Sequence, residues 1–215
     1  MALDAHSKLL REVAHRYAQA ISDEALLALA ERGISEEVAA RYSLGTVSEP
    51  HQGHEQYEGW ISIPYLTASD LCVGFKFRRL DMGLPKYGSP MGQKTHLYNV
   101  TDILLDSPHV VICEGEFDAI IVSGVLGIPA VGVPGVQAWK PWYPRLMTGY
   151  DTIFVAGDND DRDDKEDNPG QLFSKRVAGE VPNSQIVQLP SGMDITDFYL
   201  QNGRDKTREL LIGTR

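Results

Sequence analysis

The sequence has little cysteine, and what it has is not arranged to hold zinc. Only Cys72 and Cys113 are present among 215 residues. They lie far apart in apolar, strand-like stretches, where buried free thiols are usual. The absence of a Cys-x-x-Cys pair argues against a zinc ribbon. His51 and His54 form a single His-x-x-His in a polar loop, for which we expect a surface loop rather than a metal site.

Long apolar runs and an excess of positive charge are also missing. No segment reaches the roughly 20 apolar residues of a membrane-spanning helix, and no secretory leader is visible, so we expect a cytoplasmic protein with no membrane partner. The formal net charge of −10 argues against a non-specific coat on DNA, although it allows a local basic face. The absence of a Gly-x-x-x-x-Gly-Lys-Ser/Thr run argues against a fused P-loop helicase.

Two short apolar runs, 110–113 and 151–156, end directly in acidic residues. The carboxylates that follow them are Glu114, Glu116, Asp118, Asp158 and Asp160. Each run is typical of a buried parallel strand. Neighbouring strands lie about 4.8 Å apart, and an open α/β sheet binds its ligand at the carboxyl ends of the strands. We therefore expect Glu114, Asp158 and Asp160 to converge.

Converging carboxylates indicate a metal site. Three of them without a cation would repel, and at least one pKa would rise. Hard oxygen ligands suit Mg²⁺ or Mn²⁺, which pair naturally with phosphate oxygens. The alternatives are a solvated acidic loop and, for Glu116 and Asp118, a simple charge–dipole interaction in the first turn of a helix. The metal interpretation is the one the pattern favours.

The first half of the chain is expected to contain helices followed by a hairpin. Apolar spacing over 7–20 predicts a helix, and Ser22 and Ser35 are suited to cap two further helices, the second ending at Gly45. The expected strands cover 60–66 and 71–80. The helix pair lacks a basic recognition helix, so a packing role is expected.

Basic and aromatic side chains interleave after this hairpin begins. The residues concerned are Lys76, Arg78, Arg79, Lys86, Tyr87, Lys94, His96 and Tyr98. Cations that contact phosphates and rings that stack on bases suit a nucleotide or nucleic-acid surface. By composition alone, an ordinary charged hairpin face is equally compatible.

The acidic motifs resemble the Toprim pattern. The matching segments are Glu114-Gly-x-x-Asp118, Asp158-x-Asp160, residues 128–135 and Gly192-x-Asp194-x-x-Asp197. Toprim domains occur in DnaG-type primases, topoisomerases, nucleases and RecR-type repair proteins. The preceding segments resemble DnaG-type primases in the same order, namely residues 28–45, Ile61-Ser-Ile-Pro-Tyr, Val73-Gly-Phe-Lys-Phe-Arg-Arg-Leu, Pro85-Lys-Tyr and His96-Leu-Tyr.

This resemblance implies an α/β fold. A Toprim domain, which is a Rossmann-like parallel sheet with flanking helices, would cover 107–215, and a small α+β primase subdomain would cover 1–106. The chain departs from the family at Lys76 and Phe77, where the family strand has glycines. It also carries an acidic insertion at 161–168.

The activity implied by the resemblance is that of a DNA primase, an RNA polymerase that makes short RNA primers on single-stranded DNA during replication. Two Mg²⁺ (or Mn²⁺) ions would activate the attacking hydroxyl and neutralise the leaving oxygen. Asp158 and Asp160 would hold metal, and Glu114 would be a ligand or general base. Asp118 would support the site from behind, whereas Asp194 would be either a further ligand or a helix cap.

Cations in the first half would bind template or nucleotide phosphates. The residues implied are Lys76, Arg78 and Lys86, with Arg79 and Lys94 as lesser candidates. The implied partners are single-stranded DNA, ribonucleoside triphosphates, a separate zinc-binding module and a replicative helicase, in a bacterial or phage-infected cytoplasm. The acidic loop 161–167 would contact or gate a partner. Two alternatives stay open, a Toprim nuclease and a non-catalytic DNA-binding replication accessory.

Overall fold

The computed structural model describes residues 2–160 and 168–213, which form two compact units, Met1–Thr95 and His96–Arg215. The sequence places the boundary at 106/107. In the structure Tyr98 instead joins the second unit, because its backbone exchanges hydrogen bonds of 2.8 and 3.1 Å with Gly132. The 3₁₀ helix η2 (Val100–Leu104) follows in the same unit.

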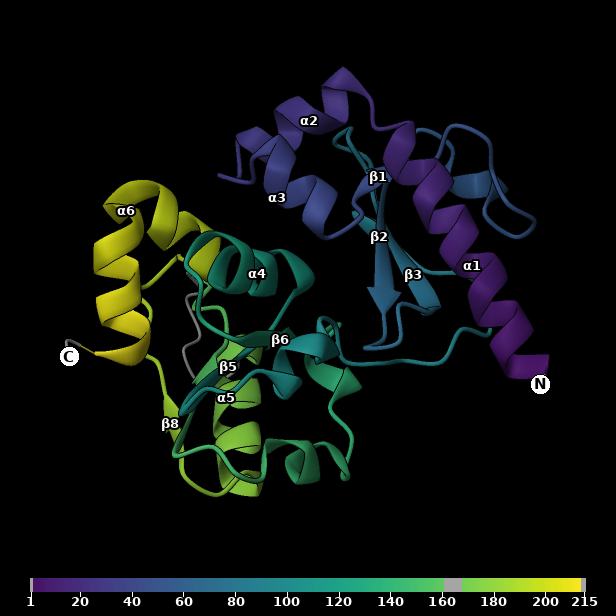
Figure 1. Ribbon diagram of the computed structural model, residues 1–215. Helices are drawn as coiled ribbons and strands as arrows, with labels where there is room; N and C mark the ends of the chain where they lie inside the picture. Colours follow the sequence, from purple (N-terminus) through teal and green to yellow (C-terminus); the bar gives the residue numbers. More distant parts are fainter. Residues whose placement is uncertain (1, 161–167, 214–215) are drawn as a thin grey trace. The chain divides into compact units, whose positions relative to one another are not determined.

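The first unit contains helices and an antiparallel sheet (Figure 1). Its helices are α1 (Ala2–Gln19), α2 (Asp23–Ala30), α3 (Glu36–Arg41) and the 3₁₀ helix η1 (Glu55–Tyr57). Its strands, in sheet order, are β1 (Gly45–Thr46), β2 (Ile61–Leu66), β3 (Cys72–Arg78) and β4 (Tyr87–Gly88). The Ser22 and Ser35 hydroxyls accept hydrogen bonds from the first turns of α2 and α3. The predicted capped helices and hairpin are confirmed.

Gly45 does not end a helix, so that prediction is wrong. The chain leaves α3 through Ser43, which has a positive φ of 52°, and Gly45 begins β1. A Cβ atom on Gly45 would lie 2.1 Å from the carbonyl oxygen of Tyr17. Glycine is therefore needed here because β1 approaches the backbone of α1.

An aromatic core joins α1 to β3. Phe75 and Phe77 are fully buried, with ring centroids 5.7 Å apart, and they pack with Tyr17 and other α1 side chains. Alternate strand residues point to opposite faces. This arrangement therefore leaves Lys76 and Arg78 on the other face of β3.

His54 belongs to this core, and the expectation of a surface loop is wrong at this residue. It is only 3% exposed, and its ring centroid lies 5.1 Å from that of Phe75 and 4.9 Å from that of Phe77. The Tyr17 hydroxyl lies 3.1 Å from His54 Nδ1. One hydrogen bond and a set of ring contacts suit a neutral imidazole. Burial, followed by the charge on His51, lowers the pKa of His54 to about 4.

We predict that His54 makes the fold sensitive to acid. Below about pH 6.5 the unfolded chain binds a proton here that the folded chain binds only near pH 4. Stability is therefore complete above about pH 6.5 and falls as the pH drops toward 4, by up to about 3 kcal/mol. His54→Phe should flatten this dependence in urea unfolding measured across that range.

His51→Gln is the control, because it removes the adjacent imidazole and leaves the buried one. The other charged groups near His54 are Arg16 on α1 and Glu55 on η1, and both variants retain them. An equally steep fall in the free energy of unfolding for His54→Phe and the unchanged chain would contradict the prediction.

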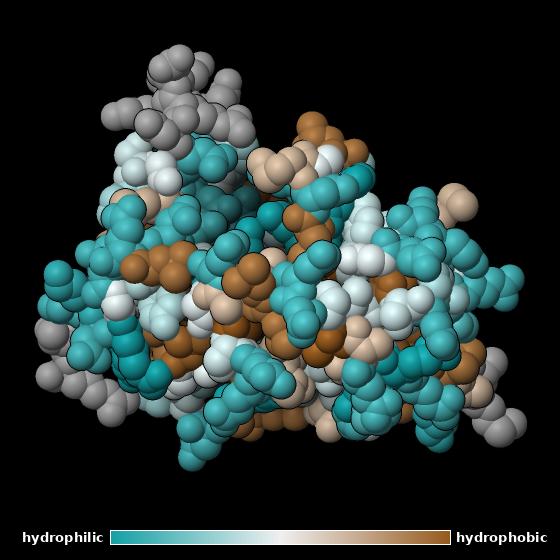
Figure 2. All heavy atoms as spheres, turned by 90° about the horizontal axis from the view of Figure 1, so that it is seen from above, coloured by the Kyte–Doolittle hydropathy of each residue, from teal (hydrophilic) through white to brown (hydrophobic). Residues whose placement is uncertain are grey.

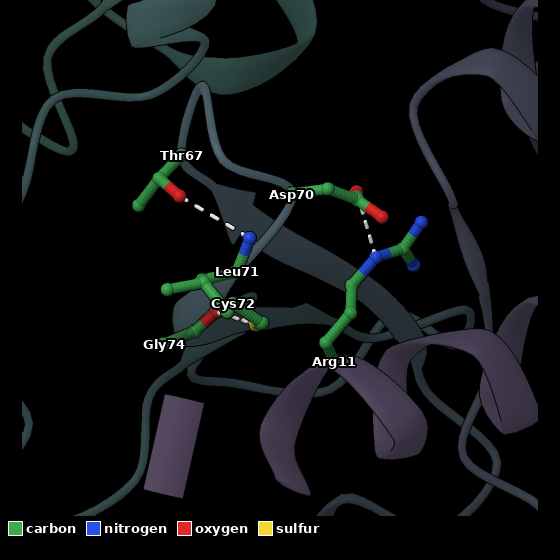
Figure 3. Close-up of polar contacts among 6 residues, drawn as sticks. All are labelled: Arg11, Thr67, Asp70, Leu71, Cys72 and Gly74. Carbon is green, nitrogen blue, oxygen red and sulfur yellow. Dashed lines mark hydrogen bonds and ion pairs between the residues drawn. The ribbon is translucent and has the colours of Figure 1, made fainter. Parts of the chain in front are cut away.

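The turn between β2 and β3 is fastened to α1 (Figure 3). Arg11 Nε donates to Asp70 Oδ1 at 2.8 Å, and the Leu71 amide donates to Thr67 Oγ1 at 3.2 Å. The Cys72 thiol is fully buried and donates to the Gly74 carbonyl. Cys72 and Cys113 are both buried free thiols, as predicted.

The second unit is built on a parallel sheet with the order β6-β5-β7-β8. These strands are β5 (His109–Cys113), β6 (Ala130–Gly132), β7 (Thr152–Ala156) and β8 (Ser184–Ile186). The helices are α4 (Glu116–Ile120), the π-helical segment η3 (Ile121–Val125), the 3₁₀ helices η4 (Val136–Ala138) and η5 (Tyr143–Met147), α5 (Pro169–Glu180) and α6 (Ile195–Ile212). The predicted α/β architecture is confirmed.

Helices cover both faces of this sheet. Phe173 and Val177 of α5 pack into one core cluster with alternate strand residues, which are Val110, Ile112, Val131, Val133, Ile153 and Val155. Helix α4 contacts β5 and β6, and Figure 1 shows it on the opposite side of the sheet from α5. Helix α4 begins just after the carboxyl end of β5, and the first turn of α5 approaches Asp158, which follows β7. The candidate site lies at these strand ends.

Some large apolar side chains are exposed on the surface. Figure 2 shows hydrophobic atoms in scattered groups among hydrophilic ones on the visible face. The most exposed large apolar residues are Met82, Leu84 and Met91. Within the described chain, no helix is both long enough and apolar enough to cross a bilayer.

Candidate active site

The ends of β5 and β7 bring Glu114 and Asp158 together. Cys113 pairs with Ala156 in the parallel register, so the residues that follow emerge at the same edge of the sheet. Glu114 Oε2 accepts a hydrogen bond of 3.0 Å from the Asp158 amide. Asp160 follows two residues later and is exposed. The sheet topology thus places the acidic residues of both motifs at one edge.

Two glycines allow α5 to approach these carboxylates. A Cβ atom on Gly170 would lie 2.2 Å from the Asp158 carbonyl oxygen and 2.6 Å from Glu114 Oε2. A Cβ atom on Gly157 would lie 2.2 Å from the Gly170 carbonyl oxygen. The backbone of the site is therefore closely packed, and side chains at either position would displace it.

Asn168 fixes the start of α5. Its Oδ1 accepts from the Gln171 amide at 3.3 Å, and its side-chain nitrogen donates to the Asp160 carbonyl at 3.0 Å. Pro169 occupies the first turn, where a proline is tolerated because its missing N–H would have no helical partner. The acidic loop 161–167, for which a partner contact was expected, lies outside the described residues.

The carboxylates perturb one another. Burial, followed by the charges of Asp118, Glu114, Asp194 and Asp160 in that order, raises the pKa of Asp158 to about 9. Burial also raises the pKa of Glu114, with Asp160 and Asp194 adding to the effect. A nearby divalent cation would offset this repulsion.

A donor set made entirely of carboxylate oxygens fits a hard divalent cation such as Mg²⁺. The residues able to hold it are Glu114, Asp158 and Asp160. Among residues 2–160 and 168–213, no three His, Cys, Asp or Glu side chains are already gathered into a metal-binding arrangement.

Asp118 is held in place by hydrogen bonds from Thr196. It is buried, and its Oδ1 accepts from the Thr196 hydroxyl at 2.9 Å and the Thr196 amide at 3.3 Å. Burial, then the charge of Asp194, raises the pKa of Asp118 to about 7. These contacts join α4 to the first turn of α6. Sequence reasoning missed Thr196, although it lies inside the Gly192–Asp197 motif.

Asp194 caps α6 and also lies near the acidic cluster. Its Oδ1 accepts from the Asp197 amide at 2.7 Å, which is the capping geometry. Its charge contributes to the raised pKa values of Glu114, Asp118 and Asp158. Asn159, which the sequence did not single out, makes backbone hydrogen bonds with Gly192 and Met193. These bonds link the segment after β7 to the segment before α6.

In the first unit, Lys76 and Arg78 converge on one ring. The Lys76 ammonium and the Arg78 guanidinium each lie 4.7 Å from the centroid of Tyr87. Lys86 and Lys94 are exposed, and Lys86 makes no ion pair with any residue that the structure describes. These side chains supply positive charge beside an aromatic ring.

Two other members of the basic and aromatic series are engaged elsewhere. Arg79 forms a bidentate ion pair with Asp81. Tyr98 is only 2% exposed and pairs with β6 in the second unit. The expectation that the Tyr98 ring belongs to an exposed surface is therefore wrong, because the backbone pairing draws this residue into the core.

Comparison with known proteins places the chain in a family. No family model matches it. The Gene 57 protein of Mycobacterium phage D29 is 38% identical over 157 residues, which are 71% of this chain and 98% of the phage protein. The chain belongs to the family of this phage protein. The DNA primase of Rickettsia felis is 26% identical over 231 residues, which cover 89% of this chain but only 38% of that primase.

Solved structures identify the fold as that of the DnaG primase catalytic core, with its Toprim domain. The Aquifex aeolicus primase structure, which holds zinc-binding and RNA polymerase domains, aligns with a TM-score of 0.76 at 20% identity over 94% of this chain and 59% of that one. A DnaG catalytic domain bound to single-stranded DNA aligns with a TM-score of 0.74 at 16% identity, covering 96% and 81% of the two chains. The predicted fold class is confirmed.

Proposed function

We propose that this chain is the catalytic core of a DNA primase that makes short RNA primers on single-stranded DNA. The observation that supports this most directly is the pairing of Glu114 with the Asp158 backbone across two parallel strand ends. It occurs within the fold of the DnaG catalytic core. The reaction is template-directed nucleotidyl transfer, in which a 3′ hydroxyl attacks the α-phosphate and pyrophosphate leaves.

Mg²⁺ or Mn²⁺ is the proposed cofactor, and Asp158 and Asp160 would hold it with Glu114. When bound, it supplies charge neutralisation at the reacting phosphate and the leaving oxygen. Burial raises the pKa of Glu114, a shift in the direction that suits a general base. Thr196 holds Asp118 in a fixed orientation behind it.

The proposed phosphate contacts come from the first unit. Lys76 and Arg78 carry two positive charges beside the Tyr87 ring, an arrangement suited to a phosphate next to a base or sugar. Lys86 is an exposed cation directly before Tyr87 in the chain. We propose that these residues bind template or nucleotide phosphates.

The proposed partners follow from the same function. They are a single-stranded DNA template, ribonucleoside triphosphates, a separately encoded zinc-binding module and a replicative helicase, within a bacterial or phage-infected cytoplasm. Starting a chain without a primer requires two nucleotides to be held on the template, which has a high positioning cost. A partner that supplies template contacts would lower it.

The test is an assay with a single-stranded template, labelled ribonucleotides and Mg²⁺ or Mn²⁺. Alkali-sensitive oligonucleotides would support the proposal. A shortened template would indicate a Toprim nuclease, and template binding without either product would indicate a replication accessory.

The same assay compares extension of an annealed primer with unprimed synthesis. We expect the purified chain to extend primers and to start chains poorly until the partner is added. Unprimed synthesis as efficient as extension would show that no partner is needed for initiation.

Lys86 provides a separate prediction. Lys86→Ala should raise the apparent KM for nucleotide or template about three- to tenfold, because a phosphate contact of about 1 kcal/mol is lost. Lys86→Arg should retain most of the activity, since arginine also binds phosphate. Lys175→Ala, at an exposed position on α5, removes the same charge elsewhere and should leave the KM unchanged. Normal synthesis by Lys86→Ala at limiting nucleotide would exclude the role.

A further inference from the structure

Arg79 is engaged by the protein itself, although it lies in the basic stretch. Its Nε and Nη2 donate to the two carboxylate oxygens of Asp81 at 2.5 and 2.8 Å. Its guanidinium carbon lies 5.0 Å from the centroid of the Trp60 ring. A two-point ion pair that is also stacked on an indole fixes the arginine more firmly than an ordinary surface ion pair does.

These contacts close the loop that carries Lys86. The Arg79 amide donates to the Lys86 carbonyl at 3.1 Å, so this hydrogen bond closes the loop 80–86 at its last residue. Asp81 Oδ1 also accepts from the Gly83 amide at 3.0 Å. A Cβ atom on Gly83 would lie 2.5 Å from the guanidinium carbon of Arg79. The first half of the loop is thus folded around the arginine head group.

A second contact holds the chain beyond Lys86. The Tyr57 hydroxyl donates to the Ser89 carbonyl at 2.7 Å, and the Tyr57 ring meets the edge of Trp60 with centroids 5.4 Å apart. Trp60 therefore links the Arg79 contact to the Tyr57 contact. Lys86 lies between two fixed points, although its own side chain is exposed.

We propose that Arg79 is a positioning residue, which holds the 80–86 loop through Asp81 and Trp60 so that Lys86 is presented in a fixed place. The inference rests on the phosphate contact proposed for Lys86. Arg79 itself does not bind phosphate in this arrangement, because Asp81 occupies its two-point donor edge and neutralises its charge. Holding the loop reduces the conformational entropy that Lys86 would otherwise lose on binding.

Substitution of Asp81 separates the two possible roles of Arg79. A phosphate-binding Arg79 would be freed by Asp81→Ala, and binding of DNA would become tighter. A positioning Arg79 would lose its partner, and binding would become weaker. We expect Arg79→Ala and Asp81→Ala each to weaken binding of a labelled single-stranded oligothymidylate about three- to tenfold in fluorescence anisotropy. Arg79→Lys should resemble Arg79→Ala, since lysine lacks the two-point fork.

The salt dependence gives an independent readout. Binding weakens as salt rises, so the slope of log K against log salt is negative. Loss of a direct phosphate contact makes this slope shallower by about 0.7 for single strands. Lys86→Ala should show this shallower slope, whereas Arg79→Ala should keep the slope of the unchanged chain. In the Lys86→Ala background, Arg79→Ala should cause no further loss. The inference would be overturned by tighter binding of DNA by Asp81→Ala or by a shallower salt slope for Arg79→Ala. It would also be overturned if the losses of affinity from Lys86→Ala and Arg79→Ala added up in the double variant.

Circular dichroism and thermal unfolding of each variant check that the first unit remains folded. The binding assay requires no synthesis, so its outcome is distinct from that of the proposed function. If the variants bind oligothymidylate as described but the chain makes no RNA, the positioning role is supported and the primase assignment is contradicted. Unchanged binding by Arg79→Ala would remove the positioning role and leave the primase assignment intact.

Discussion

Asp158→Asn is expected to reduce RNA synthesis about a thousandfold or more, because it removes a charged oxygen from the proposed metal site while keeping the shape of the side chain. The fold should be retained. Asp158 interacts with four other carboxylates, and burial with their charges raises its pKa to about 9. An uncharged amide relieves that repulsion, so the metal-free variant should unfold at the same or a higher temperature than the unchanged chain.

Asp151→Asn is the matched control. It changes the same kind of side chain just before β7, where Asp151 is exposed. We expect it to keep full synthesis. Added Mg²⁺ should raise the unfolding temperature of the unchanged chain and of Asp151→Asn, because a ligand that binds only the folded state stabilises it. Asp158→Asn should lose that rise. Synthesis retained by Asp158→Asn would exclude the metal-binding assignment.

The location of the candidate site could be predicted because its signals are local. Apolar runs 110–113 and 151–156 end directly in Glu114 and Asp158, and parallel strands bring such ends to one edge. The sequence indicates only that such strand ends can lie side by side, and the structure supplies the register, in which Cys113 pairs with Ala156. The predicted helix caps at Ser22 and Ser35 depend only on residues three positions apart.

The contacts that the sequence missed join residues far apart along the chain. Thr196 binds Asp118 across 78 positions, and His54 binds Tyr17 across 37. A polar residue in a polar segment gives no local sign that it will be buried. Tyr98 was assigned to an exposed surface for the same reason, because its partner Gly132 lies 34 positions away along the chain.

The C-terminal helix shows how a local signal can mislead. The sequence suggests a helix only through the possible cap at Asp194, whereas α6 runs from Ile195 to Ile212 across a non-helical Gly203 with φ of 78°. Arg204 and Arg208 donate to the Leu126 carbonyl beyond η3. These hydrogen bonds hold the second part of α6 in place. Because their acceptor is about 80 positions away, the sequence around Gly203 does not predict them.

Gly170→Ala is expected to have the largest effect on stability, and it tests whether the packing of α5 shapes the site. Its methyl group would lie 2.2 Å from the Asp158 carbonyl oxygen and 2.7 Å from the Asp158 amide nitrogen. Both atoms belong to the backbone, so neither can rotate away. We expect the free energy of unfolding to fall by about 2 to 4 kcal/mol, measured by urea unfolding.

Gly179→Ala supplies the matched control within the same helix. Nothing lies within 4 Å of the position its Cβ would take, and alanine favours a helix over glycine by about 0.5 to 1 kcal/mol. This variant should therefore be equally stable or slightly more stable, with normal synthesis.

The two alanine variants also separate folding from catalysis. At a temperature where Gly170→Ala remains folded, it should still lose most RNA synthesis, because the added methyl group must displace the Asp158 backbone that donates to Glu114. Equal stability of the two variants would show that the approach of α5 to the backbone of Asp158 is looser than the distances indicate. A destabilised Gly170→Ala with full synthesis when folded would show that the exact placement of Asp158 against Glu114 is not needed for the reaction.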